Sequence, residues 1–472
     1  MKNFKNISFI VLMLSVLASC DGFLDINEDP NNPTEAPIEG LMINSSFESA
    51  RNTYRVGATT SFFVQYLASP NQASSPDIHE SISYGNQWSW LYSVMSDLTD
   101  IEDLAAEIEA TDYLGAAKIL KAYNLSLLVN MYGDVPYYEA FYAETFTPEY
   151  DDSETLYQEI FQLLEDGIGY LEAGGSTVIM GDDDFVYGGD TQQWIQFGHM
   201  LRARHLNHYS KLDSYDPNAV LAAIDDAFMS SADDAEVEFF EGQINPWAQV
   251  AIDNAGLLLG GWLSEQFIDG MNAERFGVFD PRLPEMTDTT DAGIYQGVPS
   301  GAGRGSAGPS GERSTLVEGD YYTSRTSPIQ LASFTEMKFI EAEAALETDP
   351  DRAYDAYIEG IASHMDKLGV DPEDRDVYLE DPFVAVGSGN LTIDDVMREK
   401  YVAMFLHPEA WVDARRYDYA YEDMEIPANH NPALGGEFLR KVRYPDSELT
   451  RNSANIPEGG NNLLTRLFWD AE

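Results

Sequence analysis

The chain has 472 residues, of which 81 are acidic and 27 are basic, so its formal charge is −54. A charge of this sign repels nucleic-acid phosphates and anionic lipid headgroups, which excludes both as partners at ordinary salt. The single cysteine excludes an internal disulfide, a thiolate metal cluster and a cysteine nucleophile elsewhere in the chain. Because the acids are spread evenly, we expect an acidic surface suited to high salt, where screening weakens self-repulsion.

The N-terminus has the pattern of an export signal. Two lysines precede an apolar run over residues 7–17, which is too short to remain as a membrane span. Residues 17–20 read Leu-Ala-Ser-Cys and match the lipobox of bacterial lipoproteins, whose cysteine is diacylated and becomes the new N-terminus. We therefore predict a signal peptide over residues 1–19 and a lipid anchor, a diacylglycerol and an acyl chain such as palmitate, on Cys20. The alternative is a buried free cysteine that follows the signal by chance.

A flexible tether is predicted over residues 20–37. This stretch is rich in acids, asparagine and proline and has few apolar residues, so burial cannot offset the entropy of ordering it. The rest of the chain, residues 38–472, is predicted to form the folded domain, stabilised by packing alone.

The domain is predicted to be all-α. Apolar residues recur every three to four positions, first over residues 91–108 and then in helix pairs near 114–172, 194–229, 334–368 and 392–420. No pair can bury its apolar face alone. The pattern therefore predicts a tetratricopeptide-like helical-repeat scaffold, an α-α superhelix of stacked pairs.

Two long insertions interrupt this scaffold, at residues 229–333 and 369–391. They are rich in glycine, proline, aspartate and aromatic residues, and they are longer than plain connections in a compact domain. Long loops on a rigid scaffold often carry binding residues, so we expect the ligand-binding part of the protein there.

Several short motifs occur in an order typical of one family. They are FLDIN (23–27) and DPN (29–31) after the lipobox, YGDVPY (132–137), DPRL (280–283), EAEA (341–344), WVDARR (411–416), and RYP (443–445) with Glu448 and Asn452. On these motifs the whole chain resembles the SusD/RagB family, and more narrowly the SusD-like outer-membrane lipoproteins of Bacteroidota.

The resemblance implies a function that the residues alone do not give. Proteins of this family are not enzymes. They are lipid-anchored to the outer membrane at the cell surface, and they capture oligosaccharides, or in some members peptides, for a SusC-like TonB-dependent transporter. No cofactor is implied beyond the lipid on Cys20.

The stretch before the first predicted helix is one candidate ligand site. A sugar binder needs flat aromatic faces to stack on the ring and polar groups to bridge hydroxyls. Tyr84, Asn86 and Trp88 supply both. The alternative is that Trp88, with Trp90 and Tyr92, packs in the core of the helix.

A second candidate ligand site lies in the first insertion, at Tyr295, Arg304, Tyr321 and Tyr322. Glycines around Arg304 would suit an adaptable rim. Residues 303–308 also match a dinucleotide fingerprint in form, but that fingerprint requires a strand before it and a helix after it, and neither flank is predicted here.

Two groups of residues are weighed as metal sites. His205 and His208 share a helical face and can chelate a metal, although histidines on an apolar face are more often core residues. Four aspartates in a glycine-flanked loop can gather oxygen ligands for calcium, but their spacing is not that of an EF-hand loop. They are Asp182, Asp183, Asp184 and Asp190. We expect no bound metal, and we interpret Arg415 and Arg416 as a structural ion-pair network.

Two competing functions come from other classes. A surface glycoside hydrolase of paired helices would need two carboxylates about 5 to 10 Å apart across a cleft. The sequence does not single out such a pair among its acids. A protein-interaction scaffold would leave the aromatic insertions without a ligand.

Overall fold

The computed structural model describes residues 36–142, 145–255, 260–305 and 310–471. The predicted signal peptide, Cys20 and nearly all of the tether lie outside these ranges. Helices dominate the described chain, whose one sheet is an antiparallel pair, β1 (Ala235–Val237) and β2 (Ile329–Ala332). The α-helices are α2 (Ile38–Phe63), α3 (Gly85–Ile108), α4 (Thr111–Tyr132), α5 (Ser153–Ala173), α6 (Thr191–Asn207), α7 (Pro217–Asp225), α8 (Pro246–Ala255), α9 (Glu265–Met271), α10 (Phe334–Ala345), α11 (Pro350–Leu368), α12 (Pro372–Leu379), α13 (Ile393–Ala403), α14 (Glu409–Arg416) and α15 (Asp446–Arg451).

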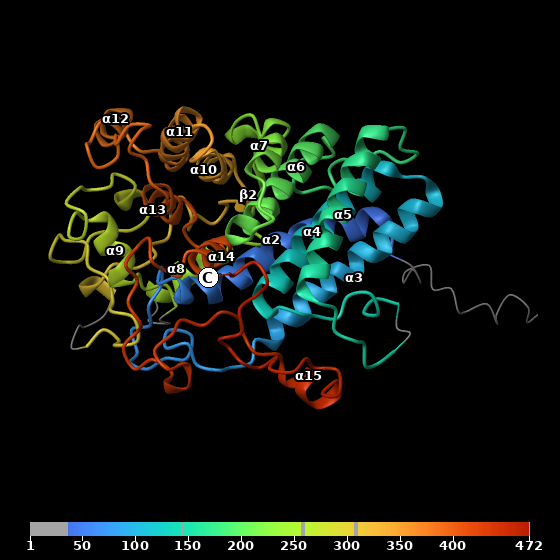
Figure 1. Cartoon of the computed structure of the whole chain (residues 1–472), viewed down its shortest axis with the longest axis horizontal. Coiled ribbons are helices and arrows are strands. Elements are labelled where there is room, and N and C mark those ends of the chain that lie inside the picture. Colours follow the sequence, from blue (N-terminus) through green and yellow to red (C-terminus); the bar gives the residue numbers. More distant parts are fainter. Residues whose placement is uncertain (1–35, 143–144, 256–259, 306–309, 472) are drawn as a thin grey trace, which may run out of the picture.

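The predicted all-α scaffold of helix pairs is confirmed. The pairs α4/α5, α6/α7, α10/α11 and α13/α14 fall in the four expected windows. Figure 1 shows α3 to α7 in one half of the molecule, and α9 and α12 with long loops in the other. Within the described ranges, no helix combines the length and the apolar character needed to cross a bilayer.

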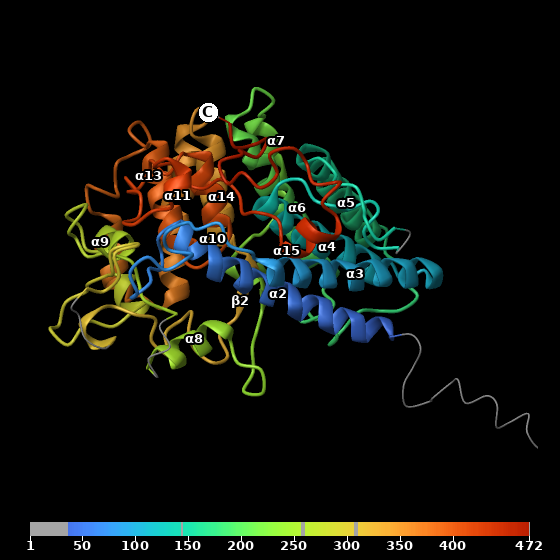
Figure 2. The same ribbon diagram turned by 90° about the horizontal axis from the view of Figure 1, so that it is seen from below.

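Helix α2 is a scaffold element that the sequence reading did not predict. Its buried face carries serine, threonine and asparagine, so apolar periodicity is weak. Two of these polar groups bond to α4: Asn124 Nδ2 donates to Ser49 Oγ at 2.8 Å, and Asn52 Nδ2 donates to Asn124 Oδ1 at 3.1 Å. Figure 2 shows α2 and α3 side by side along one edge of the molecule. The scaffold therefore begins one helix earlier than periodicity indicates.

Glycines allow two helices of a pair to pack closely, and a side-chain cap fixes where one of these helices begins. A Cβ atom on Gly115 of α4 would lie 2.8 Å from the carbonyl oxygen of Gly167 of α5, so the two backbones meet where neither has a side chain. Asp152 caps α5 by accepting hydrogen bonds from the backbone amides of Glu154 and Thr155.

Buried ion pairs join α6, α10 and α14. Arg204 of α6 donates to both carboxylate oxygens of Glu336 of α10, each at 2.6 Å. Arg416 of α14 pairs with Glu343 of α10 at 2.5 Å and with Asp413 at 2.6 Å, which confirms the ion-pair interpretation of Arg416.

Arg415 differs from the ion-pair interpretation. Its guanidinium lies between the rings of Trp411 and Trp469 and donates to the carbonyl oxygens of Asn130 and Arg440. The side chain is buried and forms none of the ion pairs of the described residues, so it joins the C-terminal segment to α4 and α14 through backbone and aromatic contacts.

The two insertions contain regular elements of their own. Residues 229–333 carry β1, α8, α9 and β2, and residues 369–391 carry α12. Both strands pack against α2, and β2 also packs against α6. The segments between these elements form the loops of the other half of the molecule.

Candidate ligand-binding cleft

An open cleft of about 510 Å³ lies where three loop regions meet. One side is formed by α9 and the residues after it, the second by residues 299–300, and the third by residues 423–428, with Gln65 at the end of α2. The volume is within the roughly 300–1,000 Å³ typical of ligand pockets. The lining is polar: Gln65, Glu265, Gln266, Asp269, Arg275, Asp423 and Glu425.

The amide and guanidinium groups of the cleft are held in place by backbone carbonyls. Gln266 Nε2 donates to the carbonyl of Glu422 at 2.7 Å, and Arg275 Nη1 donates to the same oxygen. Arg275 Nη2 donates to Gln266 Oε1 at 2.8 Å, and Gln65 Nε2 donates to the carbonyl of Glu425 at 2.6 Å. Fixed polar groups of this kind are preorganised to bind a ligand.

The carboxyl groups of the cleft are shifted toward the protonated form. Burial raises the pKa of Glu265 and of Asp269, and the charge of Asp269, one helical turn away, raises that of Glu265 further. Beneath the cleft, burial raises the pKa of Glu422 to about 8, against the opposing effect of Arg398 and Arg275. The carboxyl oxygens of Glu265 and Asp269 can accept hydrogen bonds, which suits ligand hydroxyls.

The backbone of Tyr295 is linked to the cleft lining through Asn272. Asn272 donates to Asp269 Oδ1 at 3.2 Å and to the carbonyl of Tyr295 at 3.5 Å, so Tyr295 is one residue removed from the lining. Its ring packs 6.0 Å from that of Phe279, which is 44% exposed. The pKa of Tyr295 is raised by burial and by the charges of Asp288, Glu285 and Asp320, none of which lines the cleft, so this ring lies outside the cleft lining.

Arg304 belongs to the wall behind the cleft. Its backbone amide donates to the carbonyl of Pro70 at 3.0 Å, and its guanidinium lies 5.5 Å from the ring of the buried Trp262. The fingerprint that starts at Gly303 has no regular strand directly before it, and residues 306–309 lie outside the described ranges.

Tyr84, Asn86 and Trp88 lie at the start of α3 and not in the cleft. Tyr84 is buried, and its carbonyl accepts a hydrogen bond from Tyr132 Oη at 2.8 Å. Trp88 is buried against Tyr132 and Tyr444, with ring centroids 5.0 and 6.1 Å away. Asn86 is exposed on the first turn. Trp88 therefore packs in the core, as the alternative interpretation proposed.

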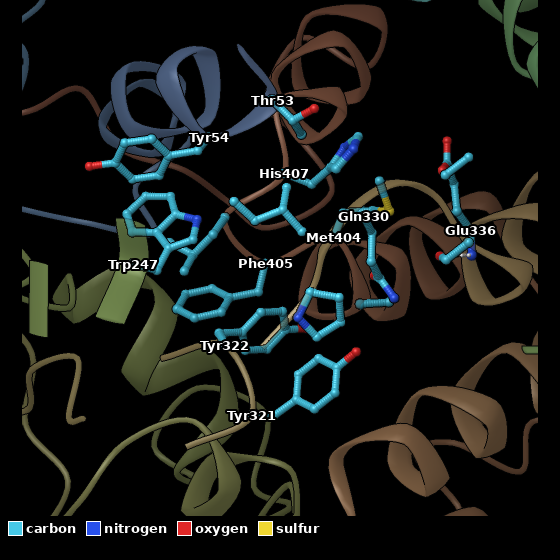
Figure 3. Close-up of a pocket in the computed structure, with 16 residues that line it drawn as sticks. Thr53, Tyr54, Trp247, Tyr321, Tyr322, Gln330, Glu336, Met404, Phe405 and His407 are labelled. Carbon is cyan, nitrogen blue, oxygen red and sulfur yellow. Dashed lines mark hydrogen bonds between the residues drawn. The ribbon is translucent and has the colours of Figure 1, made fainter. Parts of the chain in front are cut away.

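Tyr321 and Tyr322 line a separate aromatic crevice. Figure 3 shows them with Phe405, and with Tyr54 and Trp247 from α2 and α8. The free volume is about 40 Å³, far below that of ordinary ligand pockets. Tyr322 Oη is hydrogen-bonded to His364 Nε2 at 2.9 Å, so its hydroxyl already has a partner within the protein.

Of the residues weighed as metal ligands, His208, Asp184 and Asp190 have hydrogen-bond partners, whereas neither ring nitrogen of His205 has one among the described residues. His208 bonds to Glu409 and to Tyr157, and His205 packs beside it. Asp184 accepts from Trp194 Nε1 at 2.7 Å, and Asp190 caps α6. The described part of the chain contains no group of three or more His, Cys, Asp or Glu side chains placed to hold a metal ion.

The sequence reading missed most of the cleft. Gln65, Gln266, Arg275 and residues 423–428 were not singled out, and the last of these lie outside both predicted insertions. The only signal for Arg275 was its place in the long insertion.

Comparisons with known proteins agree with one another. A family model, SusD-like, described as "starch-binding associating with outer membrane", matches residues 30–445. Among solved structures, a SusD/RagB family protein of Bacteroides thetaiotaomicron aligns with a TM-score of 0.76 and 21% identity, over 93% of this chain and 99% of that one. A chitin-binding SusD homologue of Flavobacterium johnsoniae aligns with a TM-score of 0.76 and 20% identity, over 92% and 99%. No curated protein sequence matches the chain.

Proposed function

Because the chain belongs to the SusD-like family, whose members are binding proteins associated with the outer membrane, we propose that it captures oligosaccharides in the cleft beside α9. It then delivers them to a SusC-like TonB-dependent transporter. The protein is held at the cell surface by lipid on Cys20 and performs no chemistry on its ligand.

The observation that supports this proposal is the composition of the cleft. Fixed amides, a guanidinium and carboxyl groups line an opening of about 510 Å³. Sugars need such polar groups, because these groups bridge their hydroxyls.

Calorimetric titration tests the proposal. Chitotetraose, maltotetraose and a panel of tetrapeptides are titrated into the full chain, and we expect binding to at least one oligosaccharide. Arg275→Met should weaken that binding by about 10- to 100-fold, the range for a charge-assisted hydrogen bond. Arg451→Met, at the exposed end of α15, is the matched control and should bind as the wild type does.

The outcomes separate the alternatives. Binding of peptides without binding of sugars would make the protein a peptide-binding family member. New reducing ends in the incubated sugar would indicate a glycoside hydrolase. If neither class of ligand binds, the proposed capture function is wrong.

The anchor is tested on its own. Cys20→Ser removes the only thiol, so the protein should leave the membrane fraction while its sugar affinity in solution is unchanged. Retention of Cys20→Ser in the outer membrane would contradict the lipid anchor.

A further inference from the structure

Three loops are joined behind one wall of the cleft. Residues 299–300 and 427–428 line the cleft, and the amide of Ala428 donates to the carbonyl of Ser300 at 2.9 Å. The loop between α2 and α3, residues 64–84, lies behind them. Its Ala73 amide donates to the carbonyl of Gly301 at 3.1 Å, and the amide of Arg304 donates to the carbonyl of Pro70 at 3.0 Å.

One fully buried carboxylate connects these loops. Asp77 Oδ2 accepts from the amide of Gly301 at 2.7 Å and from the amide of Ser69 at 3.0 Å. The side chain is 0% exposed, and Oδ1 has no hydrogen-bond partner among the described residues. A carboxylate that is buried with two backbone donors and no paired cation lowers the stability of the folded protein. Its presence at this position therefore calls for an explanation.

We propose that Asp77 is the positioning residue of the cleft: its carboxylate fixes the wall formed by residues 299–301 and 427–428 in the arrangement that binds the ligand. Asp77 does not touch the ligand itself. The inference rests on the proposed capture function, since it names the residue that shapes that site.

The backbone at Gly301 shows how closely the wall is fitted. Gly301 has φ +74°, and a Cβ atom there would collide with the carbonyl of Ala428. A side chain at position 301 would push this loop away from residues 427–428. It would therefore disturb the same wall that Asp77 holds through the Gly301 amide. Gly301→Ala therefore disturbs the wall without changing any titratable group.

The surroundings of Asp77 make its protonation a usable readout. Burial raises its pKa to about 6, and the two backbone hydrogen bonds oppose this shift. The titratable or charged groups on the adjoining loops include His79, His430, whose ring faces His79, and Arg304, whose guanidinium lies at Trp262. In the described chain none of the three donates a hydrogen bond to the carboxylate. Protonation replaces a charged acceptor with a weaker neutral one.

The test combines affinity with amide exchange. Chitotetraose affinity of the wild type is measured from pH 5 to 7 and should fall several-fold as the pH drops through 6. Asp77→Asn should bind about 10-fold more weakly at pH 7, the effect of losing one charge-assisted acceptor, and its profile should lack the step near pH 6. The carboxyl groups of the cleft are common to both proteins, so the difference between the two profiles isolates Asp77.

Two further variants and a ligand-free measurement complete the design. Gly301→Ala should weaken binding but keep the step near pH 6, and Glu80→Gln, an exposed acid of the same loop, should match the wild type. Without ligand, the amides of Ser69 and Gly301 should exchange faster in Asp77→Asn.

The proposed capture function and the positioning role of Asp77 can fail independently. If chitotetraose does not bind the wild type, the amide exchange still decides the role of Asp77. Unchanged exchange in Asp77→Asn, or an affinity profile equal to that of the wild type, overturns the inference.

Discussion

The helix junction of α6, α10 and α14 and the loops around the cleft bury charged groups in different ways. In the junction, Arg204 meets Glu336 and Arg416 meets Glu343 at ion-pair distance. In the loops, Asp77 accepts only backbone amides, and the pKa of Glu422 rises to about 8 because nearby guanidinium groups offset its burial only in part.

The ion pairs of the junction stabilise the fold, whereas the unpaired carboxyl groups of the loops respond to pH. Against the effect of burial, Arg416 lowers the pKa of Glu343 to about 2, so this paired carboxylate stays charged over a wide pH range, whereas an unpaired buried carboxyl titrates near neutrality. The scaffold should therefore be insensitive to mild changes in pH, and the cleft should not.

Breaking the junction should have the largest effect. Arg204→Met leaves Glu336, which is 1% exposed, without its bidentate partner, and we expect a loss of about 3–5 kcal/mol in the free energy of unfolding by urea. Arg325→Met removes an exposed pair with Glu318 and should cost about 1 kcal/mol or less. Equal losses in the two variants would refute the distinction between buried and exposed pairs.

Glu422 tests the prediction that an unpaired buried carboxyl group in the loops titrates near neutrality. Its folded pKa of about 8 lies above its ordinary value of 4.5, so the native state keeps a proton that the unfolded chain releases between these values. Stability should fall as the pH rises across this window. Glu422→Gln removes the titration, so at pH 8.5 the variant should be about 2–4 kcal/mol more stable than the wild type, and equal to it near pH 4.5.

The exposed Glu437 provides the control for this titration. Urea unfolding of Glu437→Gln should follow the wild type at every pH. If Glu422→Gln also follows the wild type, Glu422 is ionised in the native state at neutral pH and the loops do not bury an unpaired carboxyl there.

A glycine contact of the scaffold should have a smaller effect. A Cβ atom on Gly57 of α2 would collide with the backbone carbonyl of Leu406. We expect Gly57→Ala to cost about 1–3 kcal/mol, more than the roughly 1 kcal/mol that alanine gains in a helix. Gly169 of α5 has open space around its Cβ position, so Gly169→Ala should raise the thermal midpoint instead.

The scaffold was predictable where apolar residues face the core. Leu156, Ile160 and Leu164 of α5 recur at helical spacing and are buried as expected. Helix α2 escaped prediction because its buried face bonds through Ser49 and Asn52, and a polar side chain that finds a buried partner looks like a solvent-facing one in the sequence.

The cleft was predictable only as a general region. Glu265 and Asp269 lie in a long insertion that was expected to carry binding residues, whereas Gln65 and Glu425 meet only after distant loops pack together. Trp88 shows the opposite case. In the sequence, Trp88 stands among polar residues like a ring that stacks on a sugar. In the structure, Tyr444, which is distant in the sequence, packs against the Trp88 ring.

Salt should have the smallest effect, and it acts on the surface alone. The net charge of −54 creates self-repulsion that salt screens, because the Debye length falls from about 10 Å at 0.1 M to about 3 Å at 1 M. We expect the thermal midpoint of the wild type to rise by about one degree between 0.05 and 0.5 M NaCl, about 1 kcal/mol for a chain of this size. The buried pair of Arg204 and Glu336 is shielded from ions, so the loss caused by Arg204→Met should be the same at both concentrations. A loss that shrinks with salt would mean that water and ions reach the junction, and a midpoint that falls with salt would remove the argument for a surface suited to high ionic strength.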